Sequence, residues 1–274
     1  MAEKVLIIGC GWLGQQLAPV LAAAGYQVFG SRRTQAAAET LPAPIQGIAL
    51  DFQSPWSAAQ LALFQDAWLI CTIPPGARQG GVSDYPQVLQ QLAQLAQAAG
   101  IKGGIHISST GIYQGLSGVV NERSELQLTQ PRVALLAAGE QALQQQDNWL
   151  TLRLSGLMGP GRHPGRFVQG RVMSGAMQPV NMVHSADVAA AVLQILSRWP
   201  LPHACYNLSS PQRVTKTEFY QAAANSLGQV ADSIDLSGPA TEPARQVSSS
   251  AFCQDSGFAF RFADARAALA YCPD

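Results

Sequence analysis

The stretch Val5-Leu6-Ile7-Ile8-Gly9-Cys10-Gly11-Trp12-Leu13-Gly14 runs from an apolar segment into a Gly-x-Gly-x-x-Gly pattern, and residues 15–24 have helical composition. The absence of polar side chains from Val5 to Ile8 is typical of a strand covered on both faces. Gly9 permits a tight strand-to-helix turn, Gly11 lets the backbone approach a pyrophosphate, and Gly14 lets helix and strand pack closely. The alternative is a glycine turn without a ligand. We interpret the stretch as a dinucleotide-binding turn with Gly9, Gly11, Trp12, Leu13 and Gly14 as cofactor-binding residues.

Length, charge and cysteine content narrow the class of protein. A chain of 274 residues suits one α/β domain with an appendage, or two unequal domains. With 17 basic and 17 acidic residues there is no electrostatic footprint for nucleic acid or an anionic membrane. The five cysteines form no C-x-x-C pattern, which indicates reduced thiols without structural metal. We therefore expect a cytoplasmic protein with a small-molecule partner, no nucleic-acid partner and no membrane span. A homodimer is a further expectation.

The residues after the second predicted strand, 26–30, favour one cofactor over another. Dinucleotide folds that take NAD usually end this strand on a carboxylate, which accepts a hydrogen bond from the ribose 2′-hydroxyl. This chain has Ser31-Arg32-Arg33-Thr34 instead. Two guanidinium groups with a hydroxyl beside them can pair with a 2′-phosphate, which a carboxylate would repel. The sequence therefore predicts NADP, with NAD less favoured; the alternative is two solvated arginines at the start of a helix.

Two further predicted strands, 46–50 and 67–72, end at residues that can line a ligand crevice. In a doubly wound sheet the carboxyl ends of the strands form that crevice. Asp51 follows the first and could accept from the adenine amino group, or cap the turn at Ser54. Ile73 and Pro74 follow the second and either press against the cofactor or simply stop the strand.

A fifth predicted strand, 104–108, follows a helix expected over 84–99 that Gly100 ends. We interpret His106 as a core-facing histidine. Ser108 is a further cofactor-binding candidate at the end of this strand. The hydroxyl of Ser109 stands where it would point at the nicotinamide end of the crevice, and Thr110 is a candidate for substrate contact.

Five motifs in sequence order carry a resemblance to a known superfamily. They are the glycine turn, ISSTGIY at 107–113, LRLSGLMGPGR at 152–162, VHSADV at 183–188 and YNLS at 206–209. The chain resembles the extended short-chain dehydrogenase/reductase superfamily, in its NAD(P)-dependent epimerase/dehydratase branch. The resemblance implies a Rossmann-type α/β fold, a doubly wound parallel sheet, with a small C-terminal α+β substrate lobe. We expect residues 1–160 and 181–199 in the sheet domain, and residues 161–180 and 200–274 in the lobe.

The resemblance also implies catalytic positions, and one of them is not kept. Ser109 stands at the position of the family's catalytic Ser or Thr, whereas the family's Tyr-x-x-x-Lys pair is absent, since none of the six tyrosines has lysine four residues later. In the family a Glu follows that Lys by four residues. Anchoring on Glu140 puts Leu136 at the Lys position and Arg132 at the Tyr position. The usual proton relay is therefore missing, and we expect slow turnover of the family's usual substrates.

Other residues become candidates for the missing chemistry. Tyr113, which the resemblance places at the substrate pocket, is the second catalytic candidate beside Ser109, although an ordinary phenol is a poor acid at neutral pH. Arg162 could bind an anionic substrate, as could Arg166, and His163 is an alternative acid. We expect an oxidoreductase or epimerase acting on a small substrate, nucleotide-linked sugars included. The alternative is a catalytically silent NADP-binding protein that reports redox state to a partner.

Overall fold

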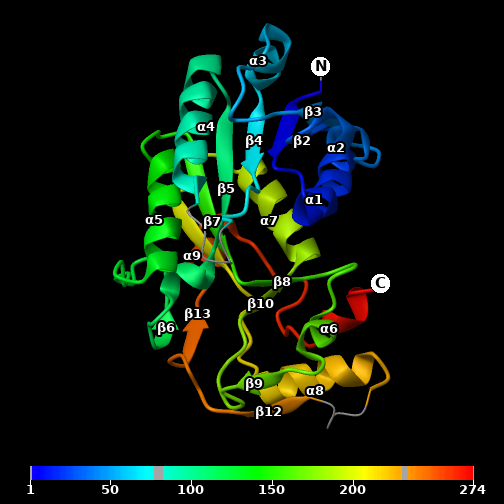
Figure 1. Cartoon of the computed structure of the whole chain (residues 1–274), viewed down its shortest axis with the longest axis vertical. Helices are drawn as coiled ribbons and strands as arrows, with labels where there is room; N and C mark the ends of the chain where they lie inside the picture. Colours follow the sequence, from blue (N-terminus) through cyan, green and yellow to red (C-terminus); the bar gives the residue numbers. More distant parts are fainter. Residues whose placement is uncertain (1, 77–82, 230–233, 274) are drawn as a thin grey trace.

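The computed structural model describes residues 2–76, 83–229 and 234–273. Its centre is a seven-stranded, wholly parallel sheet with the strand order β11-β7-β5-β4-β1-β2-β3 (Figure 1). From β1, which carries the glycine turn, the chain adds β2 and β3 on one side of the sheet and then β4, β5, β7 and β11 on the other side. This arrangement confirms the predicted doubly wound sheet. The strands are β1 (Lys4–Ile8), β2 (Gln27–Arg32), β3 (Gln46–Ala49), β4 (Trp68–Cys71), β5 (Gly103–Ser109), β7 (Trp149–Leu154) and β11 (Cys205–Leu208).

Helices cover both faces of this sheet because its strands are apolar on both faces. Val5 and Ile7 of β1 pack in one buried cluster with Leu17 of helix α1, whereas Leu6 and Ile8 belong to a second cluster. Helix α7 packs against α1 on the first side, and α4 and α5 pack together on the second side (Figure 1). The helices of the sheet domain are α1 (Trp12–Ala23), α2 (Gln35–Glu39), α3 (Ala58–Phe64), α4 (Tyr85–Ala99), α5 (Pro131–Gln144), α7 (Ser185–Ser197) and α9 (Ser250–Ser256).

A smaller lobe lies beyond the carboxyl ends of the sheet strands (Figure 1). Its short strands pair in parallel, β8 with β10, β9 with β12 and β6 with β13, and each pair joins distant segments. Thr215 caps α8, since its Oγ1 accepts a hydrogen bond from the Glu218 amide. The remaining elements are β6 (Gly118–Val120), β8 (Gly156–Met158), β9 (Val172–Ser174), β10 (Met182–His184), β12 (Asp235–Gly238), β13 (Arg245–Val247), α6 (Pro164–Val168), α8 (Lys216–Ser226), and the 3₁₀ turns η1 (Thr110–Tyr113) and η3 (Leu269–Tyr271).

The boundary between the two parts differs from the sequence prediction. Strand β11 was expected in the lobe but forms the edge of the central sheet against β7, and α9 packs against it. Strand β10 was expected to return to the sheet domain but pairs with β8 in the lobe. Neither difference is visible in local sequence, because a short apolar strand can pair with any free edge. Helix α7 contributes Val188, Ala191 and Val192 to the buried cluster that includes Val5 and Ile7 of β1.

Two C-terminal segments are held by long-range contacts. Residues 237–250 are rich in Ser, Pro and Gly, yet β13 within them pairs with β6. Residues 258–262 alternate as a strand would but form no strand. The amides of Arg261 and Phe262 donate instead to the carboxylate of Asp187, over 2.7 and 3.2 Å. A buried side chain therefore takes the place of a neighbouring strand.

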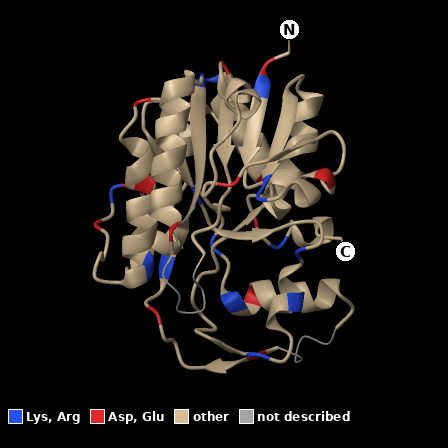
Figure 2. Cartoon of the chain, turned by 45° about the horizontal axis from the view of Figure 1, so that its top comes forward, with Lys and Arg blue, Asp and Glu red and all other residues tan. Residues whose placement is uncertain are grey.

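Three further features of the described residues concern charge, helix length and possible metal ligands. Lysine, arginine, aspartate and glutamate are sparse on the ribbon, and basic positions occur where the sheet meets the lobe (Figure 2). None of the described helices combines the length and apolar character needed to cross a membrane. Within the same residues, no three His, Cys, Asp or Glu side chains gather into a group that could hold a metal ion.

Candidate functional site

A cavity of about 1330 Å³ lies where the sheet strands end and the lobe begins. Sites for single small molecules usually measure roughly 300–1,000 Å³, so this cavity has room for a dinucleotide and a second ligand. Its wall has one side formed by the sheet domain and one side formed by the lobe. The sheet side includes Gly9, Gly11, Trp12, Leu13, Ile73, Pro74, Ser108, Ser109, Thr110, Arg132 and Leu136, and the lobe side includes Leu157, Arg162, Gln178, Lys216, Glu242 and Arg245.

The three glycines of the first turn have three separate structural roles. Gly9 has φ +77°, and an added Cβ would lie 2.9 Å from Cγ1 of Ile73. At Gly14, an added Cβ would lie 2.9 Å from Cys10 Sγ, so this glycine allows helix α1 to pack. At Gly11 an added Cβ would meet only the Gly9 carbonyl oxygen, at 3.8 Å. The backbone at Gly11 is thus open toward the cavity, as close approach of a pyrophosphate requires.

The segment expected to select the cofactor shows one buried donor without a partner. Ser31 is 3% exposed, and its Oγ accepts from the Gly9 amide over 2.8 Å, so its hydroxyl holds the glycine turn in place. Nε of Arg32 is buried and has no hydrogen-bond partner among the described residues, while Arg33 is exposed. Neither arginine lines the cavity itself. An unpartnered guanidinium donor at this strand end fits an anionic group such as a 2′-phosphate.

The residues after β3 and β4 separate into a turn cap and a cavity wall. The Asp51 carboxylate accepts from the Gln53 amide and the Ser54 hydroxyl, each over 3.1 Å, which is the capping alternative. Asp51 is not among the residues that line the cavity. Ile73 and Pro74 do line it, and Ile73 packs against Gly9.

The end of β5 presents three hydroxyl groups to the cavity wall. Ser108 is buried and donates to Oε1 of Glu140 over 2.6 Å, while Oγ1 of Thr110 lies 3.4 Å from the Ser155 hydroxyl oxygen. Oγ of Ser109 accepts from the Gly111 amide over 3.1 Å, and it is half-buried. Among the described residues nothing accepts the Ser109 hydroxyl proton. Ser109 is therefore the serine here whose proton remains available to a ligand.

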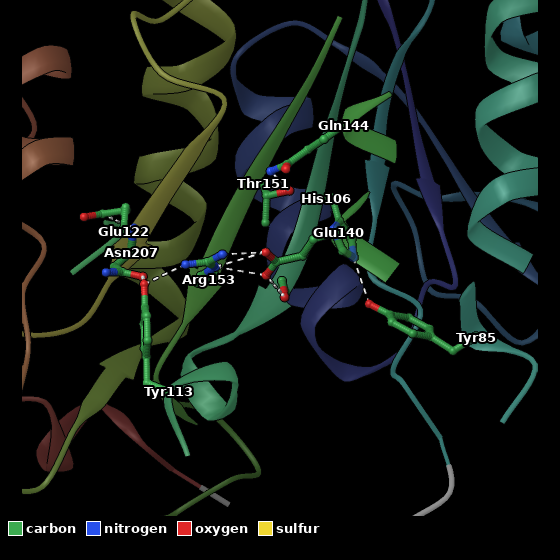
Figure 3. A network of polar contacts seen from close by, with 10 residues as sticks. Tyr85, His106, Tyr113, Glu122, Glu140, Gln144, Thr151, Arg153 and Asn207 are labelled. Atoms are coloured by element: carbon green, nitrogen blue, oxygen red, sulfur yellow. Dashed lines mark hydrogen bonds and ion pairs between the residues drawn. The ribbon is translucent and has the colours of Figure 1, made fainter. Parts of the chain in front are cut away.

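Tyr113 does not reach the cavity, which corrects the expectation that it lines the substrate pocket. It is fully buried, its hydroxyl donates to Oδ1 of Asn207 over 2.9 Å, and it accepts from Arg153 Nη1 over 2.7 Å (Figure 3). Burial raises the pKa of Tyr113 to about 12, although Arg153 and Asn207 act in the opposite direction. The short 3₁₀ turn after Ser109 directs this side chain into the core, so Tyr113 belongs to a structural network.

The positions assigned to the missing Tyr and Lys do line the cavity. Arg132 is at the second position of α5, and Leu136 is one helical turn later. Arg132 is exposed, whereas Leu136 is 1% exposed and contributes an apolar surface to the cavity wall. The two positions that the spacing from Glu140 assigns to the family's Tyr and Lys therefore both lie on the cavity wall.

Arg162 lies at the junction between the glycine turn and the lobe. Its Nε donates to the Leu157 carbonyl over 3.1 Å, and its guanidinium lies 5.3 Å from the ring centroid of Trp12. Trp12 in turn donates from Nε1 to the Pro160 carbonyl over 2.8 Å. His163 beside it is 3% exposed and accepts from the Gly165 amide, and it is not part of the cavity wall. This placement removes His163 from the acid candidates.

Sequence reasoning missed the charged residues of the lobe wall. Burial, together with the nearby charge of Arg245, lowers the pKa of Lys216, and burial likewise lowers that of Arg245 although Glu242 acts against it. Lys216 also donates to Gln178 Oε1 over 3.1 Å. These residues come from a helix start and from β13, in separate parts of the chain. No local motif could have indicated that they meet.

Comparison with known proteins agrees with this fold and site. Residues 9–198 match the protein family described as NAD(P)H-binding. The chain is similar to Protein YeeZ of Escherichia coli (strain K12), with 34% identity over 96% of this chain and 97% of that protein. It is similar in structure to MoeE5 in complex with UDP-glucuronic acid and NAD, with a TM-score of 0.80 and 19% identity over 98% of this chain and 97% of that chain. It is also similar in structure to UDP-glucuronic acid 4-epimerase from Bacillus cereus in complex with NAD, with a TM-score of 0.75 and 17% identity over 98% of this chain and 97% of that chain.

The fold and the open glycine turn define a Rossmann-type nicotinamide dinucleotide protein. With most of its sheet domain inside the family match, the chain belongs to the NAD(P)H-binding family. The likeness to these solved structures, at 17–19% identity, confirms the fold that the motifs predicted.

Proposed function

We propose that this protein is an NADP(H)-dependent oxidoreductase or epimerase that acts on a small anionic substrate, with Ser109 as its catalytic hydroxyl. The observation that carries the proposal is the continuity of one cavity. It runs from the open backbone of Gly11 past Ser109 to Lys216 and Arg245 in the lobe. A dinucleotide site, a reactive hydroxyl and a cationic end thus share one space.

The cofactor preference is argued from charge. Arg32 has a buried Nε without a partner in the described chain, and Arg33 is exposed beside it. A nicotinamide cofactor supplies hydride transfer when bound, while these two residues would pair with the 2′-phosphate that distinguishes NADP from NAD.

The charge of the cavity wall supports an anionic substrate. Among the described lining residues four are basic, namely Arg132, Arg162, Lys216 and Arg245, and one is acidic, Glu242. Because the whole chain has a formal net charge of zero, this excess is local. Thr110 and Arg162 are the proposed substrate contacts nearest the glycine turn. A phosphate or carboxylate would relieve the repulsion between Lys216 and Arg245.

A panel of carbonyl compounds and sugar nucleotides, each with NADPH, tests the proposal through the loss of NADPH absorbance. We expect turnover of anionic members of the panel and a large loss of rate in Ser109→Ala. The matched control is Ser117→Ala, because Ser117 is exposed and lies outside the cavity wall. Turnover that Ser109→Ala leaves unchanged would show that the active site lies elsewhere.

A second candidate function is supported by the missing relay. Because Leu136 stands at the Lys position and Tyr113 is buried, the described cavity wall lacks the family's Tyr-x-x-x-Lys proton donor. A catalytically silent NADP-binding redox sensor would not need that donor. Such a protein would bind NADPH and NADP⁺ with different effects on its surface and turn over nothing in the panel. Cofactor binding without turnover, with different proteolysis patterns for the oxidised and reduced cofactor, would favour this candidate.

A further inference from the structure

Arg132 is a cation on the wall of the cavity that has no ion-pair partner in the described part of the chain. It lies in the first turn of α5, it is exposed, and no described residue forms a hydrogen bond or ion pair with its guanidinium. By contrast, the buried Arg153 is fully engaged with Glu140 and Tyr113. The donors of Arg132 are therefore available to a ligand in the cavity.

The Arg132 guanidinium lies beside Ser109 because Gly111 leaves room for it. A Cβ built on Gly111 would lie 3.0 Å from Arg132 Nε, 3.3 Å from its Nη2 and 3.2 Å from Ser109 Oγ. The two side chains thus flank the same point of the backbone. Ser109 already accepts a hydrogen bond from the Gly111 amide, which leaves its own proton to be donated.

We propose that Ser109 and Arg132 form an oxyanion-binding pair that stabilises negative charge on the reacting oxygen of a carbonyl substrate. The proposal rests on the proposed function and assigns Arg132 as a second catalytic residue. It occupies the position where the resemblance expects a tyrosine, but it works by charge and not by proton donation, since an arginine stays protonated in proteins.

The step balances without a side-chain acid. A reduced nicotinamide cofactor, when bound, would supply the hydride that forms the new C–H bond at the carbonyl carbon and would itself be oxidised, so that the π electrons of the C=O bond move to oxygen. Ser109 and Arg132 hold the resulting alkoxide by hydrogen bonds, and water then protonates it. Preorganised donors of this kind are worth about 10²- to 10³-fold in rate for each one removed.

The other described groups near this pair do not replace it as an acid. Leu136 is apolar and one turn along the same helix, so no ammonium lies there to tune a phenol. Tyr85 does line the cavity, but it is 2% exposed, its hydroxyl lies 2.8 Å from Nε2 of His106, and burial raises its pKa (Figure 3). The Tyr85 hydroxyl therefore already has a partner at His106 in the core.

Calorimetric titration with oxalate, in the absence of cofactor, tests the pair by binding alone. Oxalate presents planar carboxylates that a guanidinium can hold by two parallel hydrogen bonds. We expect oxalate to bind the wild-type protein, Arg132→Gln to lose about 10- to 100-fold in affinity, and Arg132→Lys to recover part of it. Arg123→Gln is the matched control, because Arg123 is exposed and outside the cavity wall.

Oxalate affinity that is unchanged in Arg132→Gln, or no binding by the wild-type protein, would overturn the pair. Because no cofactor is present, this result stands apart from the test of NADPH turnover. With a substrate from the panel, we further expect kcat not to follow the ionisation of a phenol between pH 6 and pH 9. A kcat that follows a single ionisation and is abolished by Tyr85→Phe would assign the chemistry to the phenol instead.

Discussion

Arg153 in β7 and Glu140 in α5 form a two-point ion pair inside the protein. Nη2 of Arg153 donates to Oε2 of Glu140 over 2.6 Å, and its Nε donates to Oε1 over 3.0 Å (Figure 3). Ser108 donates to the same carboxylate from β5. Both charged side chains are less than 10% exposed. The pair therefore fixes α5, which carries Arg132, against the strand that ends at Ser109.

Breaking this pair should be costly. We expect Glu140→Gln to lower the free energy of unfolding by about 3–5 kcal/mol, because it leaves the Arg153 charge buried without compensation. Lys102→Gln is the comparison: it removes the exposed ion pair with Glu3 and should cost about 0–1 kcal/mol. Urea unfolding followed by circular dichroism measures both, and equal losses in the two variants would refute the role of the buried pair.

Stability should fall in acid because of His106. Burial, with a contribution from the Arg153 charge, lowers its pKa from 6.5 to about 3, so the folded protein keeps it neutral while the unfolded chain protonates it. This stabilisation is complete above pH 6.5 and is lost as the pH falls toward 3, at a slope approaching about 1.4 kcal/mol per pH unit.

Urea unfolding between pH 7.5 and pH 5 checks the slope. His106→Gln should show a shallower dependence on pH than the wild-type protein, whatever its stability at pH 7.5. A slope that His106→Gln does not alter would mean that another group accounts for the acid sensitivity.

Alanine at the glycines of the first turn should separate folding from cofactor binding. Gly14→Ala places a Cβ 2.9 Å from Cys10 Sγ and from Ile7 Cγ2, so we expect a loss of stability of about 1–3 kcal/mol. Gly11→Ala meets no close protein atom and should keep the wild-type melting temperature while losing cofactor affinity. Thermal unfolding and NADPH titration of both variants measure the two effects. Full NADPH affinity in Gly11→Ala would contradict a pyrophosphate at this turn.

The sequence was sufficient for the sheet because its decisive signals are local. The apolar run at 5–8 and the glycines that follow determine the first strand and turn, and counting back from Glu140 along one helix placed Arg132 and Leu136 at the cleft. The lobe was not predictable in this way. Its cationic wall joins Lys216 at the start of α8 with Arg245 in β13, and only tertiary pairing brings those segments together.

Tyr113 shows how a motif can mislead. The residues 107–113 match the family pattern, which implies a tyrosine in the substrate pocket, but the family pattern contains no information on the buried partners. Here Arg153 and Asn207 satisfy the hydroxyl inside the core. The outcome depends on two side chains from β7 and β11, and no spacing within the motif reports them.

The affinity of the protein for NADPH and NADH, measured by titration of each cofactor, tests most directly whether the glycine turn and its two arginines form an NADP site. We expect NADPH to bind more tightly than NADH, and Arg33→Ala to lose about 10- to 100-fold in NADPH affinity, with NADH affinity unchanged, because each charge-assisted contact contributes about 1.5–3 kcal/mol. Arg123→Ala controls for the loss of one positive charge. Equal affinities of the wild-type protein for NADPH and NADH would contradict this assignment.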